Sequence, residues 1–299
     1  MKAVNQRISE AINQANLGDL LVRCKFGDAK QVVCGVSGGA DSMALMVLAL
    51  ANGHEVEAVH VDHGIRESSD SESELVSYWA DYYGASFRSE KVDLSGGSDL
   101  EQRARIARHS VLGKDALTGH TADDNAETIL INLLRGAGPK GLSGIEPGPK
   151  HPILALRRSE TQQICDDLEI TPFEDPSNSD ERFVRNNVRS DLIPMMNQIS
   201  DRDIVPLLCR TGEVNRQTTD YIAEQSAGLD PTNAKVLKGF PSVIQSHVLR
   251  EWLRDELGHP PTNVQLSNVL DVLNNKTIAC EISGGRRIAR TEGVLRIEP

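Results

Sequence analysis

The sequence predicts an α/β fold with a parallel sheet, followed by a smaller, mostly helical C-terminal domain. In the first 198 residues, short runs with strand character alternate with stretches of helical periodicity. This alternation is typical of a parallel sheet that helices cover on both faces. From Asp201 onward helical patterns dominate, and the tail at residues 277–297 alternates enough to suggest a few short strands. We therefore expect one domain at residues 1–198 and a second at residues 199–299.

The individual elements follow from the same periodicities. Strands are expected at residues 31–36, 56–61, 85–92, 115–120 and 152–156. Helices are expected at residues 43–50, 71–83, 100–112, 124–135, 160–168 and 183–198, the last broken near Pro194, and then at 204–208, 219–224 and 243–257. In the helix at 124–135, the core-facing stripe consists of Ile129, Leu130, Leu133 and Leu134. The glycine-rich segment 136–144 predicts a functional or mobile loop.

The composition is that of an acidic, soluble globular protein, with 39% hydrophobic residues, 25% charged residues and a net charge of -11. No stretch approaches the ~18 apolar residues that a membrane-spanning helix needs. Residues 1–23 include Glu10 and Asp19 and lack an apolar core, which predicts an ordinary helix rather than a signal peptide. We expect a cytoplasmic protein with no membrane partner, in which any contact with RNA depends on a local basic patch.

The cysteines are scattered, odd in number, and form no Cys-x-x-Cys pair. They are Cys24, Cys34, Cys165, Cys209 and Cys280. This pattern argues against a zinc, iron–sulfur or disulfide framework and favours packing residues or free thiols.

The main functional candidate is the hexapeptide Ser-Gly-Gly-Ala-Asp-Ser at residues 37–42, between an expected strand and an expected helix. Two glycines leave no Cβ to block a polyanion, and the new helix adds free N–H donors and the positive end of its dipole. A phosphate group fits such a turn. The candidate nucleotide-binding residues are Ser37, Gly38, Gly39, Ala40, Asp41 and Ser42, of which Asp41 holds a cation or caps the helix. The lysine of a Walker A loop is absent, so this is a different phosphate-binding motif.

The order Ser-Gly-Gly-x-Asp-Ser after the first strand resembles the PP-loop ATP pyrophosphatases. This resemblance implies that ATP is split between its α and β phosphates and that the loop holds the pyrophosphate. Adenylate then passes to a substrate oxygen, whose identity the loop alone leaves open.

A second group of candidates begins at His120 and includes Asp123, Asp124 and Glu127, at an expected strand-to-helix turn. Carboxylates beside a triphosphate bind Mg²⁺ or orient a substrate, and Asp41 and Asp124 are the candidate metal ligands. The alternative is capping of the helix and complementarity to its dipole. Ligands of parallel sheets bind beyond the carboxyl ends of the strands, so one crevice can collect this turn and the hexapeptide.

The run from Gly119 to Gly144 resembles the tRNA(Ile)-lysidine synthetase branch of the PP-loop enzymes. The branch joins a His-x-x-Asp-Asp-x-x-Glu-Thr helix to Arg-Gly-x-Gly-x-x-Gly-Leu, as this chain does at residues 120–142. Further matches are Glu-Asp-x-Ser-Asn at residues 174–178 and Arg-Asn-x-x-Arg at residues 185–189. The resemblance covers residues 30–195.

This resemblance implies an enzyme that adenylates the carbonyl oxygen at carbon 2 of the wobble cytidine, in an isoleucine tRNA with a CAU anticodon. The ε-amino group of free lysine then displaces AMP to give lysidine. ATP and Mg²⁺ are the implied cofactors, and a homodimer is compatible with the sequence. The catalytic candidates are Asp41, His63, Asp123, Asp124 and Glu127, with His120 as a further contact to ATP.

The lysine amine must be neutral to attack, so the site needs a base or must desolvate the ammonium. Asp62 and His63 follow the second expected strand, and either can be this base or can contact ATP. For His63, a hydrogen-bonded structural role is the alternative.

Three arginines at the start of the helix expected at 183–198, the first of them one residue before it, lie on one helical face with no acid between them. These are Arg182, Arg185 and Arg189, which predict a track for the tRNA backbone or a solvated charged face. Arg135 is a candidate contact to phosphate or RNA, with a solvated helix-end cation as the alternative. A second candidate patch for tRNA consists of Arg286, Arg287 and Arg290.

Other interpretations use the same loop. A PP-loop tRNA thiolase would usually bring Cys-x-x-Cys pairs or a catalytic cysteine pair, and small-molecule amidating relatives lack the extension at 136–142. A non-catalytic, nucleotide-dependent tRNA-binding module would need fewer acidic residues in the crevice. Pyrophosphate release on addition of tRNA and lysine separates such a module from an enzyme.

Overall fold

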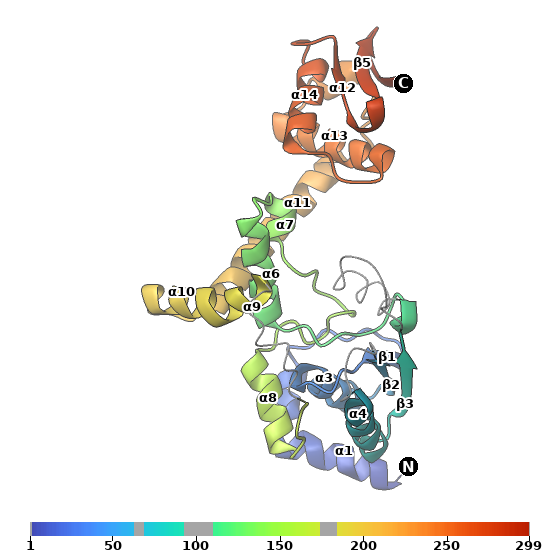
Figure 1. Ribbon diagram of the computed structural model, residues 1–299, viewed down its shortest axis with the longest axis vertical. Helices are drawn as coiled ribbons and strands as arrows, with labels where there is room; N and C mark the ends of the chain where they lie inside the picture. Colours follow the sequence, from blue (N-terminus) through green and yellow to red (C-terminus); the bar gives the residue numbers. More distant parts are fainter. Residues whose placement is uncertain (1, 63–68, 93–109, 174–183, 299) are drawn as a thin grey trace. The chain divides into compact units, whose positions relative to one another are not determined.

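The computed structural model describes residues 2–62, 69–92, 110–173 and 184–298, and Figure 1 shows how they fold. The chain forms two compact units, Met1–Glu213 and Val214–Pro299. The division falls inside α11 (Ile204–Ser226), a single helix that includes both segments expected at 204–208 and 219–224.

The start of α11 belongs to the first unit because it packs there. Val205 is buried against Ala122 and Ala126. The expected boundary at residue 198 lies instead within α10 (Ile193–Ser200), which ends at Asp201 with a left-handed backbone. A helix therefore ends close to the expected boundary, but the division between the two compact units falls after Glu213.

The sheet of the first unit is parallel, as predicted. Its strands are β1 (Gln31–Gly35), β2 (Glu55–Asp62) and β3 (Ser86–Lys91), hydrogen-bonded in that order. The strand expected at 115–120 is reduced to a single bridge, in which the Leu117 N–H donates to the Val33 carbonyl at 2.8 Å. The expectation of a strand at 152–156 is wrong, because this segment turns back on itself and Pro152 lacks an N–H for a ladder.

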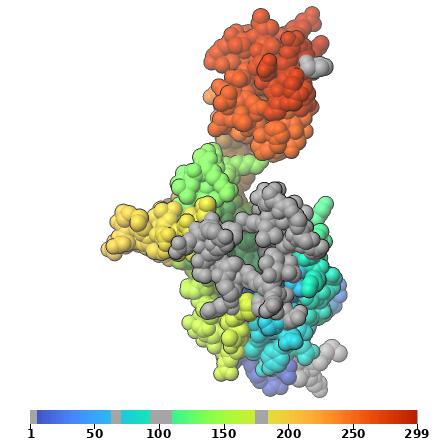
Figure 2. All heavy atoms as spheres, in the orientation of Figure 1, coloured from blue at the N-terminus to red at the C-terminus, as the bar shows by residue number. Residues whose placement is uncertain are grey.

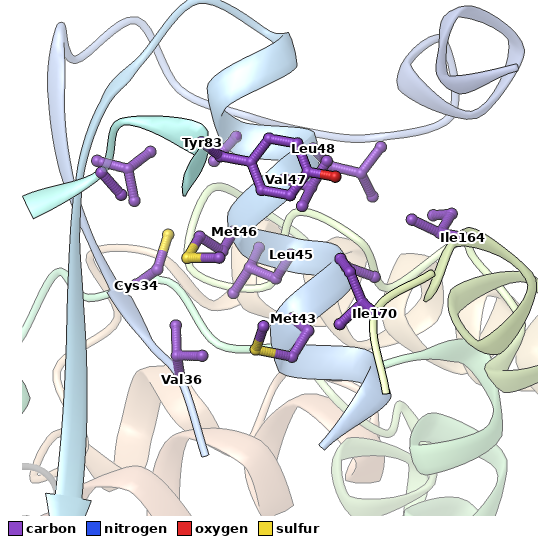
Figure 3. Close-up of a cluster of buried hydrophobic side chains, with 14 of the residues drawn as sticks. Cys34, Val36, Met43, Leu45, Met46, Val47, Leu48, Tyr83, Ile164 and Ile170 are labelled. Atoms are coloured by element: carbon purple, nitrogen blue, oxygen red, sulfur yellow. The ribbon is translucent and has the colours of Figure 1, made fainter. Parts of the chain in front are cut away.

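The core of the first unit is built around α3 (Ala40–Ala51). Its residues from Ser42 to Ala49 are all buried, because a helix with apolar side chains on every face is stable only when it is enclosed by other elements. Figure 3 shows side chains of α3 packed between the sheet and neighbouring helices. The elements that contact α3 include α1 (Lys2–Gln14), α2 (Leu17–Leu21), α4 (Ser69–Tyr83) and α8 (Arg158–Asp167). The helix that follows the hexapeptide is therefore held firmly at its position.

Helix α6 (Ala122–Leu134) carries the second group of candidates. Ile129 and Leu130 are buried, but Leu133 and Leu134 are 55% and 66% exposed, so the expected core-facing stripe is wrong in its last turn. The four residues do lie on one face of the helix. The last turn, however, extends past the packed core, and the helix ends there at Arg135.

The glycine-rich segment after α6 is more regular than expected. It contains the short helix α7 (Pro139–Leu142), with proline at the first helical position. The Asn132 side chain donates to the Gly141 carbonyl at 2.8 Å, and the Asn125 side chain accepts the Ile145 N–H at 2.8 Å. Two side chains of α6 thus fix this segment.

The helix expected at 183–198 is divided into consecutive pieces. They are α9 (Val184–Asn187), the π-helical turn η2 (Val188–Leu192) and α10. Pro194 lies in the first turn of α10, close to the predicted break. Figure 2 shows α10 in yellow at the surface, where Met195 and Ile199 are 57% and 79% exposed.

The second unit has its own core and is mostly helical, with the short strands that the alternating tail predicts. Its further helices are α12 (Ala234–Leu237), α13 (Ser242–Leu257), α14 (Asn263–Leu273) and the 3-10 turn η3 (Ser283–Gly285). Its strands, β4 (Ala279–Glu281), β5 (Arg287–Thr291) and β6 (Val294–Glu298), form an antiparallel sheet. In the part of the chain that the structure describes, no helix is both long and apolar enough to span a bilayer.

Candidate active site

The hexapeptide at residues 37–42 connects β1 to α3, as predicted. The Ser42 hydroxyl donates to the Gly39 carbonyl at 2.8 Å and accepts the Ser37 N–H at 3.1 Å. The Ser42 N–H donates to the Gly39 carbonyl at 3.1 Å, but by helix geometry the N–H groups of Ala40 and Asp41 before it have no acceptor within the helix. The turn is therefore closed by its own serines and presents backbone donors at the positive end of a buried helix.

Two glycines allow the chain to pack closely around this turn. Gly38 has φ +88°, and its carbonyl accepts the Phe173 N–H at 2.9 Å. A Cβ on Gly119 would lie 2.8 Å from the Asp41 carbonyl oxygen and 3.0 Å from the Ser42 nitrogen. Only glycine lets the segment before α6 approach the first turn of α3 so closely.

Asp41 is held from α8. The Thr161 hydroxyl donates to its Oδ1, and Arg158 Nε lies 3.7 Å from its Oδ2. Burial raises the pKa of Asp41 despite the Thr161 hydrogen bond, and the nearby charge of Asp124 adds to the rise. The side chain is still 26% exposed, so the carboxylate can meet a ligand.

Glu127 lies at the centre of a charged cluster. Its side chain is 0% exposed and receives Arg185 Nε at 2.7 Å, Arg189 Nε at 2.8 Å and Arg158 Nη2 at 3.2 Å. A buried carboxylate needs such compensation, because its desolvation is costly. Three guanidinium groups from α8, α9 and η2 thus converge on one residue of α6.

Asp124 belongs to the same cluster and also caps α6. Its Oδ2 accepts the Thr121 N–H at 2.8 Å, while its Oδ1 is 3.1 Å from Arg158 Nη2 and 3.0 Å from Arg185 Nη2. Burial opposes ionisation, but the charge of Arg158, the Thr121 N–H and the charge of Arg185 outweigh it, so the pKa of Asp124 is lowered. The capping alternative is therefore correct for one oxygen, and the other oxygen faces the arginines.

Asp123 faces α8 instead. Arg157 approaches both of its oxygens at 3.1 Å, and the Arg158 N–H donates to Oδ2 at 2.8 Å. Burial opposes ionisation here too, but these hydrogen bonds lower the pKa of Asp123. This geometry favours a role in joining α6 to α8.

Among the described residues, the cluster pairs each buried or half-buried carboxylate with at least one guanidinium group. Its guanidinium groups are those of Arg157, Arg158, Arg185 and Arg189, and its carboxylates are those of Asp41, Asp123, Asp124, Glu127 and Asp203. Arg158 connects it to the hexapeptide, because this one side chain contacts Asp41, Asp124 and Glu127.

His120 lies near the cluster and contacts a second histidine. Its Nδ1 is 2.7 Å from the Thr118 hydroxyl and 3.2 Å from Nδ1 of His151. His120 directly precedes Thr121, whose N–H donates to Asp124, and the charge of His120 also helps to lower the pKa of Asp124. Burial and the charge of Lys150 lower the pKa of His151.

Other candidates lie apart from this cluster or outside the described residues. Arg135 is exposed at the opposite end of α6, roughly 20 Å along the helix from its start. Asp62 is 3.6 Å from Lys91 Nζ. His63 and Arg182 lie outside the residues that the structure describes. The tail arginines contact their own unit: Arg286 donates to the Glu256 carbonyl, Arg287 to Glu298 and Arg290 to the Leu273 carbonyl.

Sequence reasoning missed the residues that α8 contributes. Arg157, Arg158 and Thr161 contact candidates that lie 31 to 120 positions earlier in the chain. The only sequence signal was the adjacent Arg-Arg pair before an expected helix in an acidic protein.

Comparison with known proteins identifies the family. Residues 3–196 match the PP-loop domain family. A tRNA(Ile)-lysidine synthase from Nocardia farcinica is 34% identical in an alignment of 256 positions that covers 80% of this chain and 80% of that protein. Another, from Salinispora arenicola, is 33% identical in an alignment of 307 positions that covers 90% of this chain and 91% of that protein. The chain belongs to the tRNA(Ile)-lysidine synthase family.

The solved structures support the fold of this lysidine synthase family member. U34-tRNA thiolase NcsA from Methanococcus maripaludis, solved with its 4Fe-4S cluster, aligns with a TM-score of 0.51 and 17% identity. The alignment covers 70% of this chain and 79% of that chain. At this identity the similarity shows a shared fold and leaves the chemistry open.

The cysteines of this family member are all free. Burial raises the pKa of each thiol, to about 11 for Cys24 and to about 12 for Cys34 and Cys165. Thiolates are the reactive form, so thiols with such pKa values are poor nucleophiles at neutral pH. This disfavours the thiolase interpretation.

Proposed function

We propose that this protein is an ATP-dependent ligase that converts the wobble cytidine of CAU-anticodon isoleucine tRNA to lysidine. In the first step, the oxygen at carbon 2 attacks the α-phosphorus of ATP, and pyrophosphate leaves. In the second, the neutral ε-amine of lysine attacks carbon 2, and the carbon–oxygen bond breaks to release AMP. Family membership carries this proposal, and the closed turn beside a charged cluster supports it.

The turn at residues 37–42 is the proposed pyrophosphate site. Its backbone N–H groups lie at the N-terminus of α3, where an anion is favoured by several donors and by the helix dipole. Arg158 lies beside Asp41 and can supply positive charge to the phosphates as the bond between the α and β phosphates breaks. These groups stabilise the leaving pyrophosphate.

Mg²⁺ fits Asp41 better than Asp124. Mg²⁺ usually takes one or two carboxylates and completes its shell with water and substrate phosphates. Asp41 has a partly exposed carboxylate beside the proposed phosphate site, whereas both oxygens of Asp124 already accept hydrogen bonds. Among the described residues no group of three or more His, Cys, Asp or Glu side chains could hold a metal alone. When bound, Mg²⁺ would neutralise phosphate charge at Asp41.

The cluster around Glu127 is the proposed site for orienting the lysine. An ammonium entering here would replace a guanidinium group on Glu127 or Asp124, whose oxygens the arginines now occupy. Arg185 and Arg189 remain partly exposed, at 40% and 32%, so their freed guanidinium groups can contact a phosphate. Their predicted contact with tRNA, like that of Arg135 and Arg182, belongs to this proposal.

The test is incorporation of radiolabelled lysine into CAU-anticodon isoleucine tRNA, with ATP and Mg²⁺. We expect label with the wild type, loss of label with Asp41→Ala, and retention with Asp28→Ala, a control at an exposed aspartate. An isoleucine tRNA with another anticodon should remain unlabelled. Light scattering of the purified protein tests the expectation of a homodimer.

The other outcomes separate the alternatives. If AMP and pyrophosphate formed without labelled tRNA, the enzyme would adenylate its substrate but use a nucleophile other than lysine. A sulfur nucleophile would be the first to test. Binding of tRNA and ATP without pyrophosphate release would indicate a non-catalytic module.

A further inference from the structure

The peptide group between Val36 and Ser37 is where the chain leaves the sheet and enters the hexapeptide. The ladder between β1 and β2 ends with Gly35 opposite Val59. Beyond it, side chains hold this peptide group at both ends. The Ser37 N–H donates to the Ser42 hydroxyl at 3.1 Å, and the Val36 carbonyl accepts a hydrogen bond from Nδ1 of His60 at 3.0 Å.

The chemistry of this contact fixes the orientation of His60. A carbonyl oxygen can only accept, so Nδ1 must carry the hydrogen. In the neutral ring Nε2 is then an acceptor. It is buried, and it has no hydrogen-bond partner among the residues that the structure describes. The residue itself is 2% exposed.

A buried acceptor without a partner is unfavourable, and an apolar side chain at this position of β2 would avoid it. The neighbouring inward residues of the strand, Val56 and Ala58, are indeed apolar. The Nδ1 hydrogen bond is thus the feature that a histidine adds here. It orients a carbonyl whose peptide N–H is part of the closed turn.

We propose that His60 is a positioning residue for the phosphate-binding turn. It fixes the peptide plane at the entrance of the turn, so that the following N–H groups keep their direction toward the phosphates. This inference rests on the proposed use of residues 37–42 as the pyrophosphate site. Nδ1 performs the role, and Nε2 is dispensable.

Three substitutions distinguish the two nitrogens. Asn places its amide nitrogen where Nδ1 lies, Gln places it one bond farther out, and Leu removes the donor. We expect His60→Leu and His60→Gln to raise the Kd for radiolabelled ATP, measured by equilibrium dialysis, by about tenfold, the effect of one lost hydrogen bond. His60→Asn should stay within about twofold of the wild type.

A matched control lies at the other end of the sheet. His54 Nδ1 makes the same kind of bond, 2.7 Å from the Ala29 carbonyl, before β1 begins. His54→Leu should leave the Kd for ATP unchanged. Thermal melting of each variant shows whether it is folded. The comparison of His60→Asn with His60→Gln remains valid even if the His60→Leu variant does not fold.

The inference is overturned if His60→Asn and His60→Gln weaken ATP binding equally, or if neither His60→Gln nor His60→Leu weakens it. Ser42→Ala tests the underlying site separately. If Ser42→Ala weakens ATP binding and His60→Leu does not, only the role of His60 fails. If neither Ser42→Ala nor Asp41→Ala affects ATP binding, the proposed pyrophosphate site fails.

Discussion

The phosphate-binding turn and the charged cluster are neighbours in one unit, yet they are stabilised in opposite ways. The turn is closed by neutral hydrogen bonds within six consecutive residues and by the burial of α3. The cluster consists of ion pairs between α6 and segments that follow it by about 30 to 60 positions. The turn is thus a local feature that needs space, and the cluster is a long-range feature in which buried carboxylates need guanidinium partners.

The largest expected effect is on the space around the turn. Gly119→Ala places a Cβ against the Asp41 backbone, which cannot move without displacing α3. We expect a loss of about 2 kcal/mol in the free energy of unfolding. Lysidine formation should also fall by about a hundredfold, because the first turn of α3 shifts. Urea denaturation and the labelled-lysine assay measure the two effects.

Gly18→Ala is the matched control, since nothing lies within 4 Å of the added Cβ. Equal stability of the Gly119 and Gly18 variants would show that the turn tolerates displacement.

The second prediction removes the central carboxylate of the cluster. Glu127→Gln leaves the guanidinium groups of Arg158, Arg185 and Arg189 without their common carboxylate. We expect a loss of about 3 kcal/mol in the free energy of unfolding, typical of a buried pair that loses one partner. Urea denaturation at pH 7 measures it.

Glu55→Gln removes a comparable contact at the surface, 2.6 Å from Lys30, and should leave the denaturation midpoint unchanged. If the two glutamate variants behaved alike, burial would not be what makes the cluster important.

The third prediction concerns the connection between the two regions. Arg158→Lys keeps the positive charge but loses the planar fork that contacts Asp41, Asp124 and Glu127 together. We expect the KM for ATP to rise by about tenfold with a smaller change in stability. Steady-state kinetics with varied ATP tests this. An unchanged KM would mean that Arg158 contributes only to the charged cluster and not to ATP binding.

The smallest effect is a pH dependence of stability. The pKa of Asp123 is lowered in the folded protein, so its ionised form contributes stability above the unfolded pKa of about 3.9. That contribution is lost as the pH falls through the lowered pKa. Asp123→Asn should therefore be less stable than the wild type at pH 7, and the difference should begin to shrink below about pH 4 and vanish only below the lowered pKa of Asp123. Denaturation midpoints across this range measure the convergence, and a constant gap would contradict it.

The same contrast explains what the sequence could predict. The turn, the parallel sheet, α3 and α6 were readable because glycine, apolar periodicity and motif order act over a few neighbouring residues. The apolar stripe on α6 is one turn shorter than predicted. Residue spacing shows which face of a helix is apolar, but it does not show where the elements that pack against this face end. The segment at 152–156 has the short apolar run that is typical of a strand, but such a run does not reveal that its backbone turns.

The partners in the cluster could not be predicted from local patterns. The spacing of Arg185 and Arg189 places them on one face and suggests RNA or solvent as their partner, but no local pattern points to the buried Glu127. Arg158 and Thr161 acquire their importance only when α8 folds against α3 and α6. His60 looked like an ordinary strand residue, and only its hydrogen bond to Val36 distinguishes it.

The close approach at Gly119 also has a genetic consequence. Glycine codons change by single bases only to residues that carry a Cβ, and each of these would meet the Asp41 backbone. No gradual route of small substitutions therefore leads away from glycine at this position. In a library of random variants selected for a working enzyme, position 119 should remain invariant while the exposed leucines at 133 and 134 drift.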